Sequence, residues 1–176
     1  LLSLYAVQAR PELFTAHYAF SPSLHWGDNK TVEKIITYLS SRKSLKQFIY
    51  MNLGNEIVKS EYETTNTMAA SFLRLQTFFK EHSVPGLRVK SEILKKLPHA
   101  ATNISGLVNA TNELYRNWVL PFDAIEGGPE AISEHYEKLS SDLYQEIQPR
   151  KGSINFAADY MTNGVHSPEK GMKLLK

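Results

Sequence analysis

The sequence predicts an α/β fold: a parallel sheet with flanking helices, followed by a small all-α appendage. Three apolar runs of β type, at residues 14–20, 47–53 and 87–98, alternate with segments of helical periodicity. This alternation is typical of parallel strands joined by crossover helices. The rest of the chain has only helical patterns. We therefore expect one part over residues 1–121 and a helical appendage over residues 122–176.

The composition limits the possible classes of function. The 20 basic and 18 acidic residues leave a net charge of +2 without long runs of one sign, which argues against nucleic acid as the main partner. No stretch approaches the ~18 apolar residues of a membrane span. The absence of cysteine excludes disulfides and thiolate metal sites. The compartment, cytoplasmic or periplasmic, is left open.

The first elements follow in order. Residues 1–10 read as a helix that Pro11 ends, and residues 14–20 as a short strand. The loop SPSLHWGDN leads to a helix over residues 30–41, for which Asp28 or Asn29 is a suitable N-cap. Because Leu1 starts inside an apparent helix, with no initiator Met and no cap, we expect an upstream part of the protein to precede it.

The central elements give the sheet its candidate functional positions. The strand at residues 47–53 ends in the turn Gly54-Asn55-Glu56, and a helix over residues 62–82 follows. The next strand begins at Leu87 with alternating apolar and charged residues. Since Pro98 cannot continue a ladder, this strand should stop just before His99 and leave that histidine on a loop.

The remaining segments read as helices. The helix after His99 has one apolar face and should end at Pro121; we expect its buried positions to be Leu107, Thr111, Leu114 and Trp118. Further helices are predicted from Pro129, over residues 153–163 and over residues 168–176. Such an appendage resembles one unit of a helical repeat, which must pack on the core or on further neighbours.

An acid after one strand and a histidine after the next point to hydrolase chemistry. The carboxyl ends of parallel strands share one edge, so Glu56 and His99 should lie there together. Acid before histidine is the order found in α/β-hydrolases, where the histidine takes a proton from a serine and the acid orients it. No glycine is followed two positions later by serine, so the nucleophile should lie upstream of Leu1.

These segments resemble the carboxyl-terminal half of the esterase D-like and enterochelin-esterase-like serine hydrolases of the α/β-hydrolase superfamily. The similar stretches are LLSLYAVQARPELFTAHYAFSPSLHW and QFIYMNLGNE, followed by His99. The tail EGGPEAISEHYEKLS and SINFAADYM is similar to a tetratricopeptide-like appendage of some members. The resemblance implies His99 as general base, Glu56 as orienting acid, and Trp26 and Ser23 as substrate-binding residues.

The resemblance therefore implies a carboxylic ester hydrolase that acts through a Ser-His-acid mechanism with no metal or organic cofactor. The implied partners are a small-molecule ester and the missing amino-terminal half of the same protein, or further copies of the chain that cover the uncovered strand edge. The alternative is a non-catalytic protein-interaction module on a hydrolase-like scaffold. In that alternative the helical tail binds a partner. Without the resemblance, Glu56 reads as a solvated turn acid and Trp26 as a loop anchor.

Overall fold

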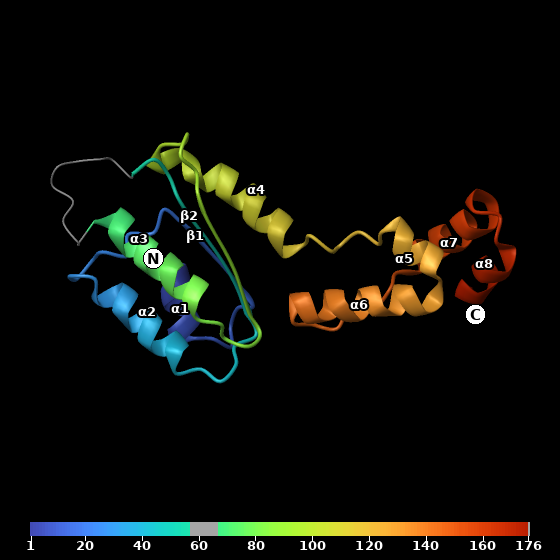
Figure 1. The fold of residues 1–176 in the computed structure, drawn as a ribbon, viewed down its shortest axis with the longest axis horizontal. Helices are drawn as coiled ribbons and strands as arrows, with labels where there is room; N and C mark the ends of the chain where they lie inside the picture. The colour runs from blue at the N-terminus through green and yellow to red at the C-terminus, as the bar shows by residue number, and fades with distance from the viewer. Residues whose placement is uncertain (57–66, 176) are drawn as a thin grey trace. The chain divides into compact units, whose positions relative to one another are not determined.

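The computed structural model describes residues 1–56 and 67–175, which form two compact units. The first unit is Leu1–Leu114 and the second is Tyr115–Lys176. The sequence had placed this division after residue 121. Figure 1 shows that the first unit contains the strands and that the second unit is helical.

The first unit contains a parallel sheet, as the sequence predicted. Its strands are β1 (Ala16–Phe20), β2 (Gln47–Leu53) and β3 (Leu87–Ile93), in the order β1-β2-β3. Both pairs are parallel, and Tyr50 lies in register with Tyr18 on one side and Lys90 on the other. All residues of β2 are buried, because a central parallel strand is covered on both faces.

Helices cover the two faces of this sheet. On one side lie α1 (Leu2–Ala9), α2 (Lys30–Ser40) and α3 (Met68–Glu81); on the other lies α4 (Thr102–Leu114) (Figure 1). Alternate residues of β2 divide between the faces. Three of them join the main apolar cluster with α1, α2 and α3: Ile49, Met51 and Leu53. Their neighbours Phe48, Tyr50 and Asn52 alternate with these and lie on the α4 side.

The prediction for the buried face of α4 was wrong. Its buried positions are Thr102, Gly106 and Ala110, whereas Leu107 is 52% exposed and Trp118 lies beyond the end of the helix. The cause is the aromatic surface of the sheet beneath it. A Cβ atom on Gly106 would lie 2.6 Å from Cδ1 of Phe20, so only small side chains fit between this helix and the strands.

Two element boundaries, the start of α3 and the end of β3, also differ from the sequence prediction. Helix α3 begins at Met68, whereas a start at residue 62 was predicted; residues 62–66 lie outside the described part of the chain. The hydroxyl of Thr67 caps the helix by accepting a hydrogen bond from the Ala70 N–H at 3.0 Å. Asn29, one of the two residues predicted there, occupies the N-cap position of α2. It makes no side-chain capping bond, and its amide oxygen accepts a bond from Ser71 Oγ at 2.5 Å. Strand β3 ends at Ile93, where a turn replaces the ladder before Pro98.

The second unit is helical, as predicted for the tail. It contains α5 (Phe122–Gly127), α6 (Pro129–Leu143), α7 (Lys151–Asp159), a π-helical turn η2 (Tyr160–Gly164) and α8 (Pro168–Leu174). Its core is a small apolar cluster: Ile125, Ile132, Ala157 and Met161. Helix α5 was not predicted from the sequence, and the tetratricopeptide-like character of the tail stays a prediction.

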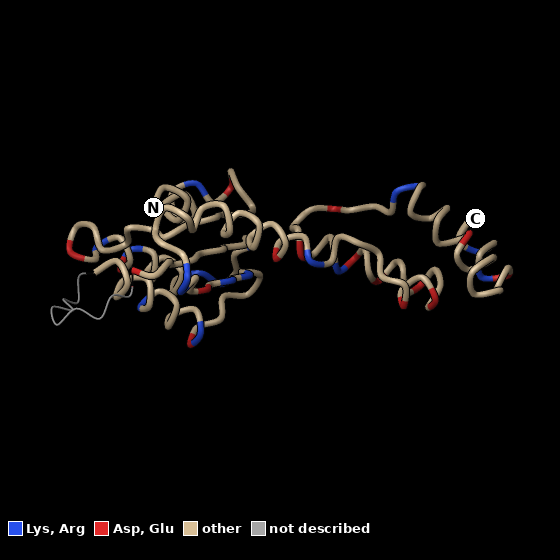
Figure 2. The backbone as a smooth tube through the Cα atoms, turned by 90° about the horizontal axis from the view of Figure 1, so that it is seen from above, with Lys and Arg blue, Asp and Glu red and all other residues tan. Residues whose placement is uncertain are grey.

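Charged positions are distributed over both units. Figure 2 shows Lys and Arg interspersed with Asp and Glu along the described chain. Among the helices of residues 1–56 and 67–175, none has the length and apolar character needed to cross a membrane.

Candidate functional site

The candidate site lies at the carboxyl-terminal edge of the sheet. Strand β1 ends at Phe20 and is followed by Ser21, β2 runs into the Gly54-Asn55-Glu56 turn, and the segment after β3 ends in a short 3₁₀ turn, η1 (His99–Ala101). Because the strands are parallel, all three chain segments leave the sheet at the same edge. This edge is where open α/β sheets place their ligands.

His99 and Glu56 are in direct contact at this edge. The Nδ1 atom of His99 lies 2.7 Å from Oε1 of Glu56. The two side chains differ in exposure: that of Glu56 is 15% exposed and that of His99 is 56% exposed. A half-exposed imidazole held by a mostly buried carboxylate presents its far side to solvent.

The contact determines which imidazole nitrogen is available for chemistry. An ionised carboxylate only accepts hydrogen bonds, so the bond to Glu56 requires the proton on Nδ1 of His99. Nε2 of the neutral ring is then an acceptor, and it makes no hydrogen bond to any residue that the structure describes. The arrangement is suited to accepting a proton at Nε2.

Gly54 makes room for the Glu56 carboxylate. A Cβ atom on Gly54 would lie 2.7 Å from Oε2 of Glu56 and 2.7 Å from the carbonyl oxygen of Leu97. The same turn is joined to the segment after β3, because the Asn55 N–H donates to the Leu97 carbonyl at 2.8 Å. The close approach that glycine permits therefore brings the acid turn against the chain that leads to His99.

The segment between β3 and His99 is held by backbone bonds. The Leu94 N–H donates to the Leu53 carbonyl at 2.7 Å, and the Leu97 N–H donates to the Leu94 carbonyl at 2.9 Å. Pro98 is extended, and the Thr102 hydroxyl donates to the His99 carbonyl at 2.8 Å. These bonds replace the longer strand that the sequence predicted and still deliver His99 to the edge of the sheet.

A buried polar layer that was not predicted from the sequence lies beneath this pair. It consists of Ser21, Asn52 and Thr102, with exposures of 3%, 0% and 0%. Asn52 accepts from the Ser21 N–H through Oδ1 at 3.1 Å and donates through Nδ2 to the Thr102 carbonyl at 3.2 Å. An asparagine in a strand buried along its whole length was the signal for such a layer, because a buried amide needs partners.

The polar layer extends beneath α4. Tyr50 is fully buried and donates a hydrogen bond to Glu92 Oε1, which also accepts from Asn109 Nδ2 at 2.7 Å. Burial, reinforced by the bond to Glu92, raises the pKa of Tyr50 well above its usual value. Tyr50 is thus a neutral phenol that holds β2, β3 and α4 together.

The two predicted substrate-binding residues lie in the loop between β1 and α2. Trp26 is 62% exposed and Ser23 is half-buried. No hydrogen bond, ion pair or ring contact joins either residue to His99 or Glu56 within the described part of the chain. Their role in substrate binding stays a prediction.

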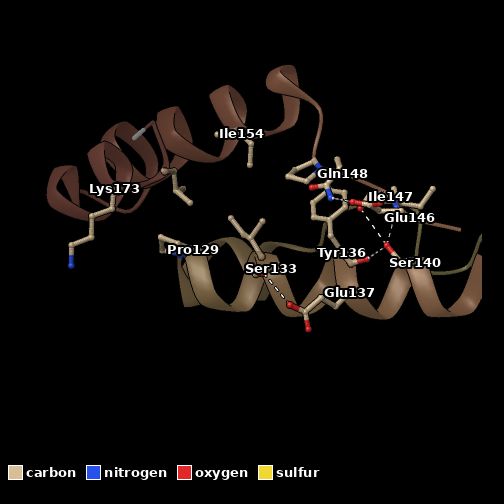
Figure 3. A pocket seen from close by; sticks show the side chains of 13 residues that line it. Pro129, Ser133, Tyr136, Glu137, Ser140, Glu146, Ile147, Gln148, Ile154 and Lys173 are labelled. Atoms are coloured by element: carbon tan, nitrogen blue, oxygen red, sulfur yellow. Dashed lines mark hydrogen bonds between the residues drawn. The ribbon is translucent and has the colours of Figure 1, made fainter.

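No group of three or more His, Asp or Glu side chains is placed to hold a metal ion in the described residues. The helical unit contains a separate pocket of about 560 Å³ between α6, the segment before α7, and α8. Figure 3 shows Tyr136 and Ser140 of α6 pointing toward Ile147 and Gln148, with Ile154 on the facing helix.

Comparison with solved structures identifies a similar fold. A serine hydrolase from Shewanella oneidensis, described as IroE-like, superposes with a TM-score of 0.77 at 14% sequence identity. The fold is that of a hydrolase-like α/β protein. The match covers 98% of this chain and 54% of the other, so the chain spans about half the length of that hydrolase. No protein-family model matches the chain, and neither does any curated protein.

Proposed function

We propose that residues 1–176 provide the histidine and the acid of a serine hydrolase that cleaves carboxylic esters. His99 is its general base and Glu56 the acid that orients it. The observation that supports this is the 2.7 Å contact between His99 Nδ1 and Glu56 Oε1 at the carboxyl edge of a parallel sheet. The likeness to an IroE-like serine hydrolase supports it independently. Within that class, we place the chain with the esterase D-like and enterochelin-esterase-like enzymes.

The chemistry follows from the orientation of the imidazole. A serine hydroxyl attacks the ester carbonyl while its proton passes to Nε2 of His99, and the resulting imidazolium protonates the departing alcohol. Water then attacks the acyl-enzyme with His99 again accepting the proton, which releases the acid and restores the serine. Glu56 stabilises the imidazolium through its bond to Nδ1. Trp26 and Ser23 border the ester-binding pocket in this proposal.

The serine comes from outside residues 1–176 in this proposal, because these residues contain no G-x-S-x-G sequence. Strand β1 pairs only with β2 among the described strands, so its other edge is open to a further strand. We propose that the amino-terminal half of the same protein pairs there. Size exclusion with mass analysis of residues 1–176 tests this: a bound second fragment or an oligomer is expected, and a stable monomer of 20.0 kDa would contradict it.

Ester turnover tests the role of His99. We expect His99→Ala, in the protein that includes the serine-bearing half, to lower hydrolysis of p-nitrophenyl acetate by about 10²–10⁴-fold, the usual contribution of a general base. His166→Asn is the matched control, since His166 is an exposed histidine of the helical unit whose backbone conformation asparagine tolerates. Equal turnover in His99→Ala and the control would exclude the proposed role.

The pocket of the helical unit supports a second candidate, a non-catalytic interaction module. Its lining combines apolar Ile132 and Ile154 with charged Glu137 and Lys173, as a binding surface for another protein requires. The two candidates differ in their sensitive residues. An interaction module would keep its function in His99→Ala and lose partner binding in Ile154→Asp, whereas a hydrolase shows the opposite pattern in ester turnover.

A further inference from the structure

Ser21 has a backbone conformation that its residue type rarely adopts. Its φ is 37°, in the left-handed region, which residues other than Gly, Asn and Asp rarely adopt. It directly follows β1, so it lies at the edge of the sheet where Glu56 and His99 meet. Strained residues of this kind persist where surrounding bonds hold them, and they gather at functional sites.

Several bonds hold Ser21 in this conformation. Its N–H donates to the Asn52 carbonyl at 2.9 Å and lies 3.1 Å from Asn52 Oδ1. Its Oγ accepts from the Gly54 N–H at 3.2 Å and lies 3.2 Å from Thr102 Oγ1. These partners lie at the end of β2, in the turn that follows it, and at the start of α4.

The Ser21 hydroxyl lies at the junction of the two turns that hold the pair. Gly54 precedes Glu56 by two residues in one turn, and Thr102 hydrogen-bonds the His99 carbonyl at 2.8 Å in the other. Because a hydroxyl both donates and accepts, Ser21 can donate to Thr102 while Thr102 donates to His99. One buried oxygen thus links the acid turn to the histidine turn.

We infer that Ser21 and Thr102 are positioning residues that hold the turns of Glu56 and His99 at hydrogen-bonding distance. The inference rests on the proposed function and adds two residues to it that touch neither substrate nor reacting atoms. Ser21 is not the nucleophile in this proposal. The residue is only 3% exposed, and its Oγ is hydrogen-bonded to the Gly54 N–H and to Thr102 Oγ1.

The experiment observes His99 directly in residues 1–176, by ¹⁵N NMR of its imidazole. Three variants are compared with the wild type. Ser21→Gly removes the hydroxyl and accepts a positive φ, Thr102→Val removes a hydroxyl at nearly constant shape, and Thr102→Ser keeps the hydroxyl as the matched control. Glu56→Gln gives the spectrum of a ring without its carboxylate.

We expect Ser21→Gly and Thr102→Val to raise the population of His99 that is not bonded to Glu56 by about fivefold, the effect of losing one hydrogen bond. Thr102→Ser should keep the wild-type spectrum. Thermal unfolding of each variant is measured alongside. A lower midpoint with an unchanged His99 spectrum would mean a structural role only, and would overturn the inference.

Two outcomes separate this inference from the proposed function. If Glu56→Gln changes the His99 spectrum but Ser21→Gly and Thr102→Val do not, the positioning role alone is wrong. If Glu56→Gln leaves the spectrum unchanged, the pair itself is absent and both proposals are wrong. Covalent labelling of Ser21 by a fluorophosphonate, detected by mass spectrometry, would also overturn its assignment as a positioning residue.

Discussion

Gly106→Ala tests how closely α4 approaches the sheet. A Cβ at this position would lie 2.3 Å from Asn52 Nδ2 and 2.6 Å from Phe20 Cδ1. Ordinary carbon contacts are about 3.5–4.0 Å, so the helix or the ring must shift by about 1 Å. The shift also strains the bonds that Asn52 makes to Ser21 and Thr102.

Two effects of opposite sign decide the result. Replacing glycine by alanine inside a helix stabilises it by about 1 kcal/mol. Overpacking costs about 1–3 kcal/mol, and each of the two weakened Asn52 bonds adds about 0.5–1 kcal/mol. We therefore expect Gly106→Ala to lower the free energy of unfolding by about 1–4 kcal/mol.

Hydrogen exchange of the β2 amides measures this loss in the first unit alone. Gly152→Ala in α7 is the control, because nothing lies within 4 Å of the added Cβ. It should leave the exchange of the β2 amides unchanged, because Gly152 belongs to the second unit. If Gly106→Ala proved as stable as the wild type or more stable, α4 would not pack on the sheet as described.

Three further changes test the packing of the first unit. Burial lowers the pKa of His17 below its usual value of 6.5, so the unfolded chain protonates this imidazole more readily than the folded protein does. The free energy of unfolding should therefore fall as the pH drops below about 6.5, and His17→Gln should reduce this pH dependence in urea titrations. Tyr50→Phe removes the buried hydrogen bond to Glu92 and should lower the free energy of unfolding in urea by about 1–3 kcal/mol. An unchanged unfolding midpoint would show that the bond does not stabilise the fold. Gly54→Ala should displace Glu56 and raise the rate of imidazole hydrogen exchange at His99 Nδ1; a wild-type rate would contradict the close fit.

The elements that sequence could predict are those with local signals. The three strands follow from β-type runs separated by helical periodicity, and the sheet is parallel as expected. The proximity of Glu56 and His99 follows from their places after neighbouring strands. Helix α5 was missed because its six residues are too few to show a period.

The features that sequence could not predict depend on segments far apart in the chain. The buried face of α4 is formed by Gly106 and Ala110 because aromatic side chains of β1 and β2 fill the space opposite it. The Ser21–Thr102 contact spans 81 positions of the chain. No local pattern around Ser21 indicates its positive φ, which is fixed by bonds to β2 and α4.

The central claim, that Glu56 and His99 act as one unit in ester hydrolysis, is tested most directly by a double-mutant cycle. Turnover of p-nitrophenyl acetate is measured for the wild type, Glu56→Gln, His99→Ala and the double variant, each joined to the serine-bearing half. We predict that Glu56→Gln lowers turnover less than His99→Ala does, and that it causes no further loss once His99 is absent. An equal fold loss from Glu56→Gln in both backgrounds, or no loss in the first, would contradict the claim.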